Sequence, residues 1–470
     1  MIPTKKQNET FIIDGRCFQI LCERTRLDYV GEEVVAVHPL YSTKSGGDRA
    51  LKKTRWLRYL SSLVLFCTLT AAGAADLGLA KEKKSGPAVQ TGIELLLEKP
   101  EMLKGKKVGL ITNPTGVTED LTHDVDALLA KNVNLVAVYG PEHGIRGTEQ
   151  AGSVPGTYED PKTGLPFYNL YGKTPQEISP LFRDVDVILF DIQDVGSRFY
   201  TYISTMAYAM KAAALEDKPF IVLDRPNPIG GEKVEGSVLD PAYESFVGIY
   251  PIPVRHGMTV GELAVLFNEQ FLVKEIGKKA DLQIVQMKGW KRDMQYDETG
   301  LAWVLPSPNM PTPDTALVYP GNCLFEGTNL SEGRGTTRPF ELVGAPYIKG
   351  WEIAERMNRL NLPGVAFREA YFNPTFSKHA GINVGGLQIY VTDREKYDPI
   401  RTALTIMVEL KELYPDDFAW RSDNWIDKLM GTDKVRKAID EGASVDDIIA
   451  DWQAELNAFK QLRKTYLLYH

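Results

Sequence analysis

Short apolar runs alternate with amphipathic segments through the first half of the globular chain. Four runs end at polar or turn-forming residues: Lys107–Thr112, Asn134–Tyr139, Val185–Phe190 and Phe220–Leu223. Runs of this length with such boundaries predict buried strands. Asp120–Ala130 and Ser204–Leu215 carry apolar residues at helical spacing. Strands that alternate with helices predict a parallel, doubly wound α/β sheet.

Polar loops follow each of these predicted strands. The second strand leads into Gly140–Gly147, read GPEHGIRG, which contains Glu142, His143 and Arg146. Ligands bind at the carboxyl edge of an open parallel sheet, so side chains from all four loops are expected to converge there. The other candidates in these loops are Asn113, Asp191, Asp194, Arg198, Asp224, Arg225 and Asn227.

The second half of the chain predicts a smaller packing subdomain that forms one wall of a cleft. The proline-rich stretch Trp303–Thr315 predicts irregular structure, and we place a boundary near Pro313. Glu326–Arg338 is a long polar, glycine-rich loop, a type that is often functional. A strand at Leu387–Val391 and a helix over 399–413 are expected beyond it.

The N-terminal region predicts export. Four basic residues from Lys52 to Arg58 precede a short apolar stretch, and Ala72-Gly73-Ala74 fits a cleavage site. Residues 51–75 are therefore expected to be a signal peptide and 76–91 a linker, which places the mature protein in the periplasm or outside the cell. A membrane anchor is the alternative, although the apolar stretch is short for a span. Our hypothesis for residues 1–50 is a mis-assigned start, with initiation at Leu51.

Composition narrows the classes of partner and cofactor. The 470 residues are 43% hydrophobic and 25% charged, which suits one large or two medium domains. Without residues 1–75 the chain keeps Cys323 as its one cysteine, so no intramolecular disulfide is expected, and its net charge is about −12. That charge opposes binding to nucleic acid or to an anionic membrane surface.

Several common chemistries lack their sequence motifs. No G-x-G-x-x-G follows a strand and no phosphate-binding loop motif occurs, so no nucleotide cofactor is expected. His143 and His256 have no neighbouring ligand set, and we expect hydrogen-bonded histidines without a metal. Ser197 and Ser331 lack the G-x-S-x-G turn of a serine hydrolase. Cys323 is expected in the core.

Carboxylates beside arginines and aromatic residues favour hydrolysis of a sugar. Glycoside hydrolysis needs a protonated carboxylic acid and a second group that acts as base or nucleophile. Glu142 is the candidate acid; alternatively it pairs with Arg146 or caps a helix. Candidates for the second group are Asp191, Asp194, Asp224 and Glu332, with Asp191 and Asp224 favoured because they directly follow strands. Each could instead cap a helix or fix an arginine.

Three arginines could bind a substrate carboxylate in a bidentate manner: Arg198, Arg225 and Arg334. Salt bridges to nearby aspartates are the alternative role. Tyr200 and its aromatic neighbours could form a platform for a sugar, or could belong to the core.

Six motifs in fixed order resemble the exo-acting β-N-acetylmuramidases of bacterial peptidoglycan turnover. They are GPEHGIRG, DIQDVGSRFYTY, LDRPNPIGG, PVRHGMT, SPNMPT and EGTNLSEGRGTTRPFE, and the resemblance extends from Gly92 to the C-terminus. It implies a Rossmann-like catalytic subdomain, 92–312, an α+β subdomain, 313–470, and a cleft between them. It also implies release of N-acetylmuramic acid from the non-reducing ends of glycan fragments or muropeptides.

In that family the glutamate of the P-E-H-G motif is the proposed catalytic residue, and it corresponds to Glu142. By our inference the other polar motif residues, including His143, His256, Asn309, Glu332 and Arg334, contact the substrate, and an arginine pocket would receive the lactyl carboxylate. Two alternatives stay open, a sugar-binding receptor without turnover and a peptidoglycan amidase or esterase. An amidase or esterase would usually need a metal.

Overall fold

The computed structural model describes residues 7–13, 16–25, 34–37, 89–145 and 156–470, and its contacts divide the chain into Met1–Lys83 and Lys84–His470. The first unit contains an antiparallel sheet in the order β1-β2-β3, formed by Gln7–Ile13, Arg16–Thr25 and Val34–Val37. The predicted signal peptide, 51–75, lies outside the described residues, as do most of the linker and Arg146.

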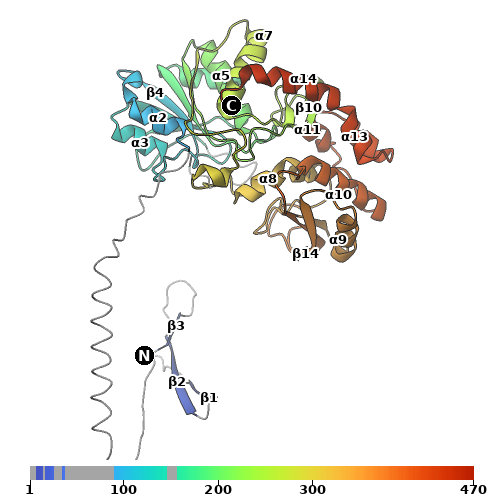
Figure 1. Cartoon of the computed structure of the whole chain (residues 1–470). Coiled ribbons are helices and arrows are strands. Elements are labelled where there is room, and N and C mark those ends of the chain that lie inside the picture. Colours follow the sequence, from blue (N-terminus) through green and yellow to red (C-terminus); the bar gives the residue numbers. More distant parts are fainter. Residues whose placement is uncertain (1–6, 14–15, 26–33, 38–88, 146–155) are drawn as a thin grey trace, which may run out of the picture. The chain divides into compact units, whose positions relative to one another are not determined.

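The second unit contains a seven-stranded sheet in the order β12-β9-β8-β4-β5-β7-β6. Figure 1 labels β4 in this sheet. All its strand pairs are parallel except β6 with β7. The strands are β4 (Val108–Thr112), β5 (Leu135–Gly140), β6 (Tyr158–Glu159), β7 (Pro166–Asn169), β8 (Val187–Asp191), β9 (Phe220–Leu223) and β12 (Leu282–Val285). The four predicted strands are thus confirmed as β4, β5, β8 and β9.

Helices cover both faces of this sheet and bury the apolar side chains that its strands direct to each side. Ile188 and Phe190 of β8 pack with α5 (Tyr202–Leu215) and α6 (Val260–Phe267). Val187 and Leu189 point to the opposite face, in the cluster that contains α2 (Gly92–Glu98) and α3 (Asp124–Ala130). This two-sided burial explains the near-continuous apolar runs and confirms a doubly wound parallel sheet.

Smaller elements lie between the strands and helices of the first half of the chain. They are α4 (Pro175–Ile178), β10 (Glu235–Val238), which pairs with β11 (Pro253–Arg255), and α7 (Val273–Ile276). Helix α6 begins with a capping box, in which Thr259 and Glu262 each bond the other's backbone N–H.

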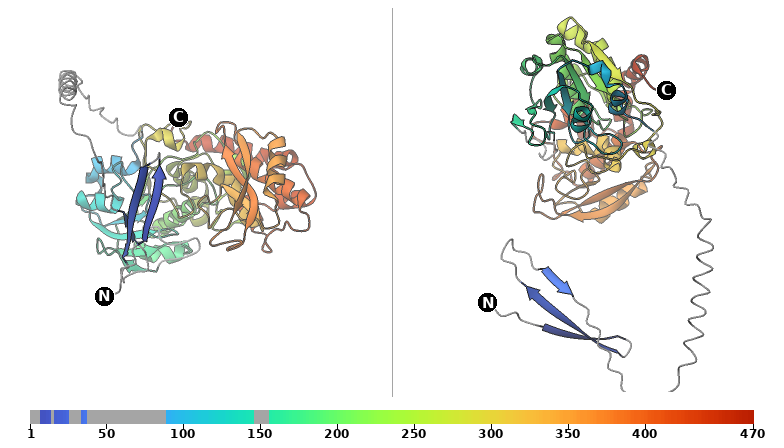
Figure 2. Two further views of the ribbon diagram at one scale, coloured as in Figure 1. Left: turned by 90° about the horizontal axis from the view of Figure 1, so that it is seen from below. Right: turned by 90° about the vertical axis from the view of Figure 1, so that its left-hand side faces the viewer.

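The second half of the chain combines helices with a small antiparallel sheet, in the order β13-β15-β14. Its elements are α8 (Pro313–Asn322), β13 (Leu342–Ala345), α9 (Gly350–Arg359), β14 (Val365–Phe372), β15 (Val384–Val391), α10 (Pro399–Leu413), α11 (Trp425–Met430), α12 (Lys434–Asp440), α13 (Val445–Asp451) and α14 (Gln453–Arg463). Figure 2 shows the β14–β15 sheet and the large sheet at opposite ends of the unit.

The predicted boundary near Pro313 stays a prediction. Pro313 begins α8, whose apolar side chains share one core cluster with α5 and α10. The expected strand at Leu387–Val391 is part of β15, and the expected helix over 399–413 is α10. Among the described residues, no helix is long and apolar enough to cross a membrane.

Candidate active site

A cavity of about 220 Å³ lies where β5 and β7 end and α5 begins. Glu142 and His143 follow β5, and Tyr171 follows β7. Other lining residues come from α8 and the segment after it: Tyr319, Glu326 and Arg334. Residues from both halves of the chain therefore line one cavity.

The turn after β5 directs Glu142 into this cavity. Gly140 permits close packing of β5 against β7, because a Cβ there would lie 2.7 Å from the ring of Phe167. His143 has a φ of 73°, a left-handed conformation that is uncommon for residues other than glycine. Such backbone strain is often found at functional sites.

Two hydroxyl groups bond the carboxylate of Glu142. Thr201 Oγ1 donates to Glu142 Oε2 over 3.4 Å, and the side chain of Tyr171 also forms a hydrogen bond with Glu142. Burial, followed by the charge of Glu142, raises the pKa of Tyr171 to about 12. Tyr171 is therefore protonated at neutral pH and is a hydrogen-bond donor to Glu142.

Aromatic rings form much of the remaining lining. The ring centroids of Tyr200 and Tyr202 lie 4.8 Å apart, and those of Tyr200 and Tyr319 lie 5.6 Å apart in an edge-to-face arrangement. Tyr319 meets Phe340 in the same way at 4.7 Å. These rings belong to the core and also line the cavity, so both roles considered for Tyr200 apply. They give a rigid surface suited to the C–H face of a sugar.

A charged network around Arg334 borders the same cavity. Arg334 Nη2 donates to Glu326 Oε1 over 2.6 Å, and Arg334 Nε lies 3.3 Å from Glu332 Oε1. The guanidinium also lies 4.9 Å from the ring centroid of Phe340. Glu332 is buried behind the cavity and pairs with Lys378 at 3.0 Å. Of the predicted contact residues in this loop, Arg334 reaches the cavity.

Asp191 and Arg225 form a buried pair within the sheet edge. Arg225 donates to the two carboxylate oxygens of Asp191 over 2.5 and 2.8 Å, and also to the carbonyl of Val117. Both side chains are at most 5% exposed. The structure thus favours the salt-bridge alternative for both residues over the predicted catalytic and substrate-binding roles.

Asp224 is surrounded by hydrogen-bond donors from other parts of the fold. Its carboxylate accepts from the hydroxyls of Thr259 and Tyr469 and from the backbone N–H groups of Arg225 and Gly261. Burial raises the pKa of Asp224 to about 6. These contacts assign Asp224 to fixing the start of α6, away from the cavity that contains Glu142.

The side chains of Arg198 and Asn227 form hydrogen bonds with backbone atoms, which occupies the groups that were predicted to bind substrate. The guanidinium of Arg198 donates to the carbonyls of Ser237, Ile252 and Leu429. With its side chain 1% exposed, it is not positioned to receive a substrate carboxylate. Asn227 bonds the backbone of Ile229 and Met258. The predicted substrate contacts of both residues are not supported by this geometry.

The remaining predicted residues lie behind the lining. Asn113 and Tyr202 both donate to the carbonyl of Pro306, next to Ser307 in the cavity wall. Asp194 Oδ2 accepts from the backbone N–H of Gly196 and lies 3.4 Å from His256 Nε2. These side chains and that of Asn309 are buried. The described residues contain no cluster of three or more side chains that could hold a metal ion.

Sequence reasoning missed several cavity residues, notably Tyr171, Glu326, Tyr319 and Trp425. Tyr171 follows a four-residue strand that begins with proline, a weak strand signal. Glu326 was visible as the first residue of the EGTNLSEGRG motif. Tyr319 and Trp425 had no sequence signal that distinguished them from core aromatics.

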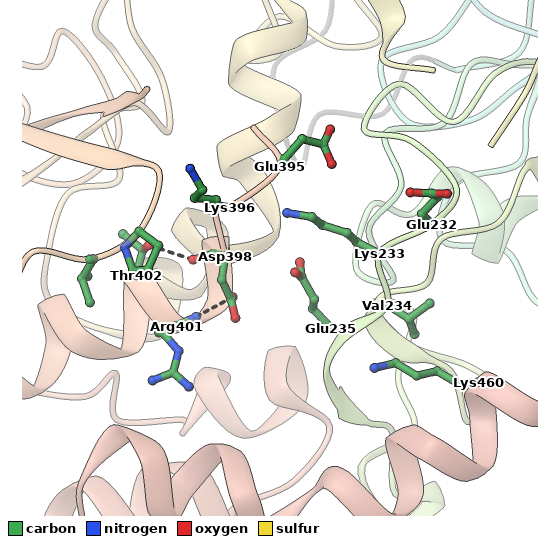
Figure 3. A pocket seen from close by; sticks show the side chains of 12 residues that line it. Glu232, Lys233, Val234, Glu235, Glu395, Lys396, Asp398, Arg401, Thr402 and Lys460 are labelled. Carbon is green, nitrogen blue, oxygen red and sulfur yellow. Dashed lines mark hydrogen bonds between the residues drawn. The ribbon is translucent and has the colours of Figure 1, made fainter. Parts of the chain in front are cut away.

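A second cavity, of about 600 Å³, lies between the β10 segment and the start of α10 (Figure 3). Side chains of both signs line it, among them Lys233, Glu235 and Asp398. The ammonium group of Lys233 donates to the carbonyls of Arg394 and Tyr397, which ties the two segments together. This cavity contains none of the predicted site residues.

Comparisons with known proteins agree over most of the chain. Residues 108–314 match the family model described as the N-terminal part of the exo-β-N-acetylmuramidase NamZ, and residues 317–469 match the model of its C-terminal part. The peptidoglycan β-N-acetylmuramidase NamZ of Bacillus subtilis strain 168 is 52% identical over 413 residues, which are 87% of this chain and 98% of that protein.

Two crystal structures of DUF1343 family proteins from Bacteroides fragilis share the fold. The first has a TM-score of 0.76 at 41% identity and covers 82% of this chain and 99% of its own. The second has a TM-score of 0.68 at 33% identity and covers 81% and 99%.

Proposed function

Since this chain belongs to the NamZ family of exo-β-N-acetylmuramidases, we propose that it hydrolyses the bond that links a terminal, non-reducing N-acetylmuramic acid to a peptidoglycan fragment. Glu142 is the general acid of this reaction. It gives its proton to the glycosidic oxygen as the bond from that oxygen to the anomeric carbon breaks. General acid catalysis of this kind contributes roughly 10²- to 10⁴-fold to the rate.

The position of Glu142 is the single observation that supports this proposal most. Its carboxylate lies in an aromatic-lined cavity and accepts hydrogen bonds from Thr201 and Tyr171. A small cavity closed by rings from both halves of the chain suits one terminal sugar, as exo-acting hydrolysis requires. Of the three arginines predicted to receive the lactyl carboxylate, Arg334 is the one that lines this cavity.

The test compares wild type with Glu142→Gln on the disaccharide N-acetylmuramyl-β-1,4-N-acetylglucosamine. Its sugar leaving group needs a proton, so we expect the variant to lose at least about 100-fold in kcat. Glu119→Gln, on an exposed turn, is the matched control. N,N′-diacetylchitobiose, which lacks the lactyl group, should be cleaved poorly by the wild type. Activity is expected to survive a chelator.

A different outcome would favour one of the alternatives. If the wild type binds the disaccharide but releases no sugar, the protein is a receptor. If it instead releases a peptide or acyl group in a chelator-sensitive reaction, the amidase or esterase alternative holds.

Export remains a proposal that rests on the sequence of residues 51–75. The basic, apolar and small-residue segments there have the order of a cleavable signal. An exported enzyme would meet its substrate in the cell wall. N-terminal sequencing of the protein from its source cells should begin shortly after Ala74; a start within the first fifty residues would contradict both export and initiation at Leu51.

A further inference from the structure

The geometry points to Glu326 as the second catalytic carboxylate of this cavity, acting together with Glu142. This inference rests on the proposed glycosidase function and supplies the group that Asp191 and Asp224 do not. It assigns a role to a residue at the junction of α8 and the glycine-rich loop.

Glu326 and Glu142 line the same cavity, Glu142 from the turn after β5 and Glu326 from the segment after α8. Tyr171 lies near both carboxylates. Its hydroxyl bonds Glu142, and the charges of Glu142 and Glu326 add to the effect of burial in raising the pKa of Tyr171. A pair of carboxyl groups that flanks one cavity is the arrangement that glycoside hydrolysis uses. Asp191 and Asp224, by contrast, are enclosed by their own partners.

The surroundings of the two carboxylates differ in charge. Glu326 forms an ion pair with Arg334 over 2.6 Å, a charge-assisted hydrogen bond. Thr201 and Tyr171, which bond Glu142, are neutral hydroxyls. The two carboxylates therefore have different partners, as suits two different roles in glycoside hydrolysis.

Further contacts hold Glu326 in place. Lys378 donates to the carbonyls of Phe325 and Leu330, on both sides of Glu326 in the chain, over 2.7 Å each. The same ammonium pairs with Glu332, which pairs with Arg334. A catalytic group needs such support to keep a productive geometry.

The reaction balances with these two groups. Glu142 gives its proton to the leaving oxygen, which keeps the electron pair of the broken bond to the anomeric carbon. Glu326 stabilises the positive charge that develops at that carbon, and it takes a proton from the water whose oxygen bonds there. One water is consumed, and Glu142 regains its proton from solvent as Glu326 releases one.

The experiment uses a leaving group that needs no protonation. On 4-nitrophenyl N-acetyl-β-muramide, we expect Glu142→Gln to stay within about tenfold of wild-type kcat, and Glu326→Gln to lose at least about 100-fold. On the disaccharide, both variants should lose at least about 100-fold. Glu341→Gln is the control, since Glu341 likewise pairs with an arginine, Arg338, in the same loop region but does not line the cavity.

The outcomes separate the inference from the proposed function. If wild type hydrolyses both substrates and Glu326→Gln keeps kcat within about threefold on both, the inference is overturned and the glycosidase function stands. If wild type hydrolyses neither, the function itself fails. If circular dichroism shows that Glu326→Gln is unfolded, Glu326→Asp is tested instead. A kcat loss of at least about tenfold in that variant, with KM little changed, supports the inference. Wild-type kcat in Glu326→Asp overturns it.

Discussion

The hydroxyl of Tyr469 donates a 2.6 Å hydrogen bond to Oδ2 of Asp224, which follows strand β9 and lies 245 residues earlier in the chain. The same hydroxyl accepts from the backbone N–H of Met287, and the N–H of Leu468 donates to Glu262. The segment around Tyr469 therefore closes the edge of the sheet at β9 and α6.

Tyr469→Phe should destabilise the fold without altering catalysis. The change removes a donor from a buried carboxylate, and hydrogen bonds to charged groups contribute about 1.5–3 kcal/mol. We expect the free energy of unfolding to fall by about that amount in urea titrations, with kcat unchanged in the folded protein. A loss below about 0.5 kcal/mol would show that water replaces the hydroxyl.

Asp224 should make stability depend on pH in the acid range. Its pKa is raised from 3.8 to about 6 by burial, so the folded state binds the proton more tightly than the unfolded state. Its contribution is present below pH 4 and is lost as pH rises through about 6, a change of about 3 kcal/mol at most. Urea titrations from pH 4 to about 7 should show a larger fall in wild type than in Asp224→Asn. Asp191, whose pKa is also raised to about 6 by burial, contributes to the fall in both proteins. Equal pH slopes would contradict it.

Arg225→Met should unfold the protein more readily, because it leaves Asp191 buried without its partner. Breaking one side of a buried ion pair costs about 3–5 kcal/mol. The double variant Asp191→Leu, Arg225→Met should recover much of the lost thermal stability. A stable Arg225→Met protein with a raised KM for the disaccharide would restore the substrate-binding role predicted from the sequence.

Tyr171→Phe should lower kcat on the disaccharide. The tyrosine hydroxyl bonds Glu142 and helps to hold its carboxyl group in a productive position. Without this hydroxyl we expect kcat to fall about tenfold with a small change in KM. Tyr168→Phe, a tyrosine in β7 that does not line the cavity, is the control. Wild-type kcat in Tyr171→Phe would mean that this hydrogen bond does not position Glu142.

Lys378→Met should lower kcat while Lys378→Arg keeps part of it. The ammonium group holds both flanks of Glu326 and balances Glu332, so its loss releases the loop that carries Glu326. We expect a kcat loss of about tenfold, and a small change in KM, by disaccharide assay. Lys396→Met, which breaks an exposed pair with Asp393, should have little effect. Equal kcat values in Lys378→Met and Lys396→Met would show that Lys378 does not position Glu326.

The large sheet and the position of Glu142 could be predicted from the sequence because both depend on local patterns. Strands buried on both faces are apolar throughout, as in β8 and β9, and a residue that directly follows such a strand must lie at the sheet edge. That argument brought Asp191 and Asp224 to the same edge as Glu142.

The sequence could not tell which of these carboxylates face the cavity. That choice depends on partners distant in the chain, Arg225 for Asp191 and Tyr469 for Asp224. Glu326 and Tyr319 were out of reach for the same reason, since only the packing of α8 against α5 brings them to Glu142.

The bond between Tyr469 and Asp224 also sets an order for biosynthesis. A ribosome makes β4, β5, β8 and β9 long before it adds residue 469, so the nascent chain carries an unfinished sheet edge with its carboxylate still hydrated. The closure of this sheet edge must therefore wait until residue 469 has left the ribosome. Until then the polypeptide remains open to chaperones and proteases.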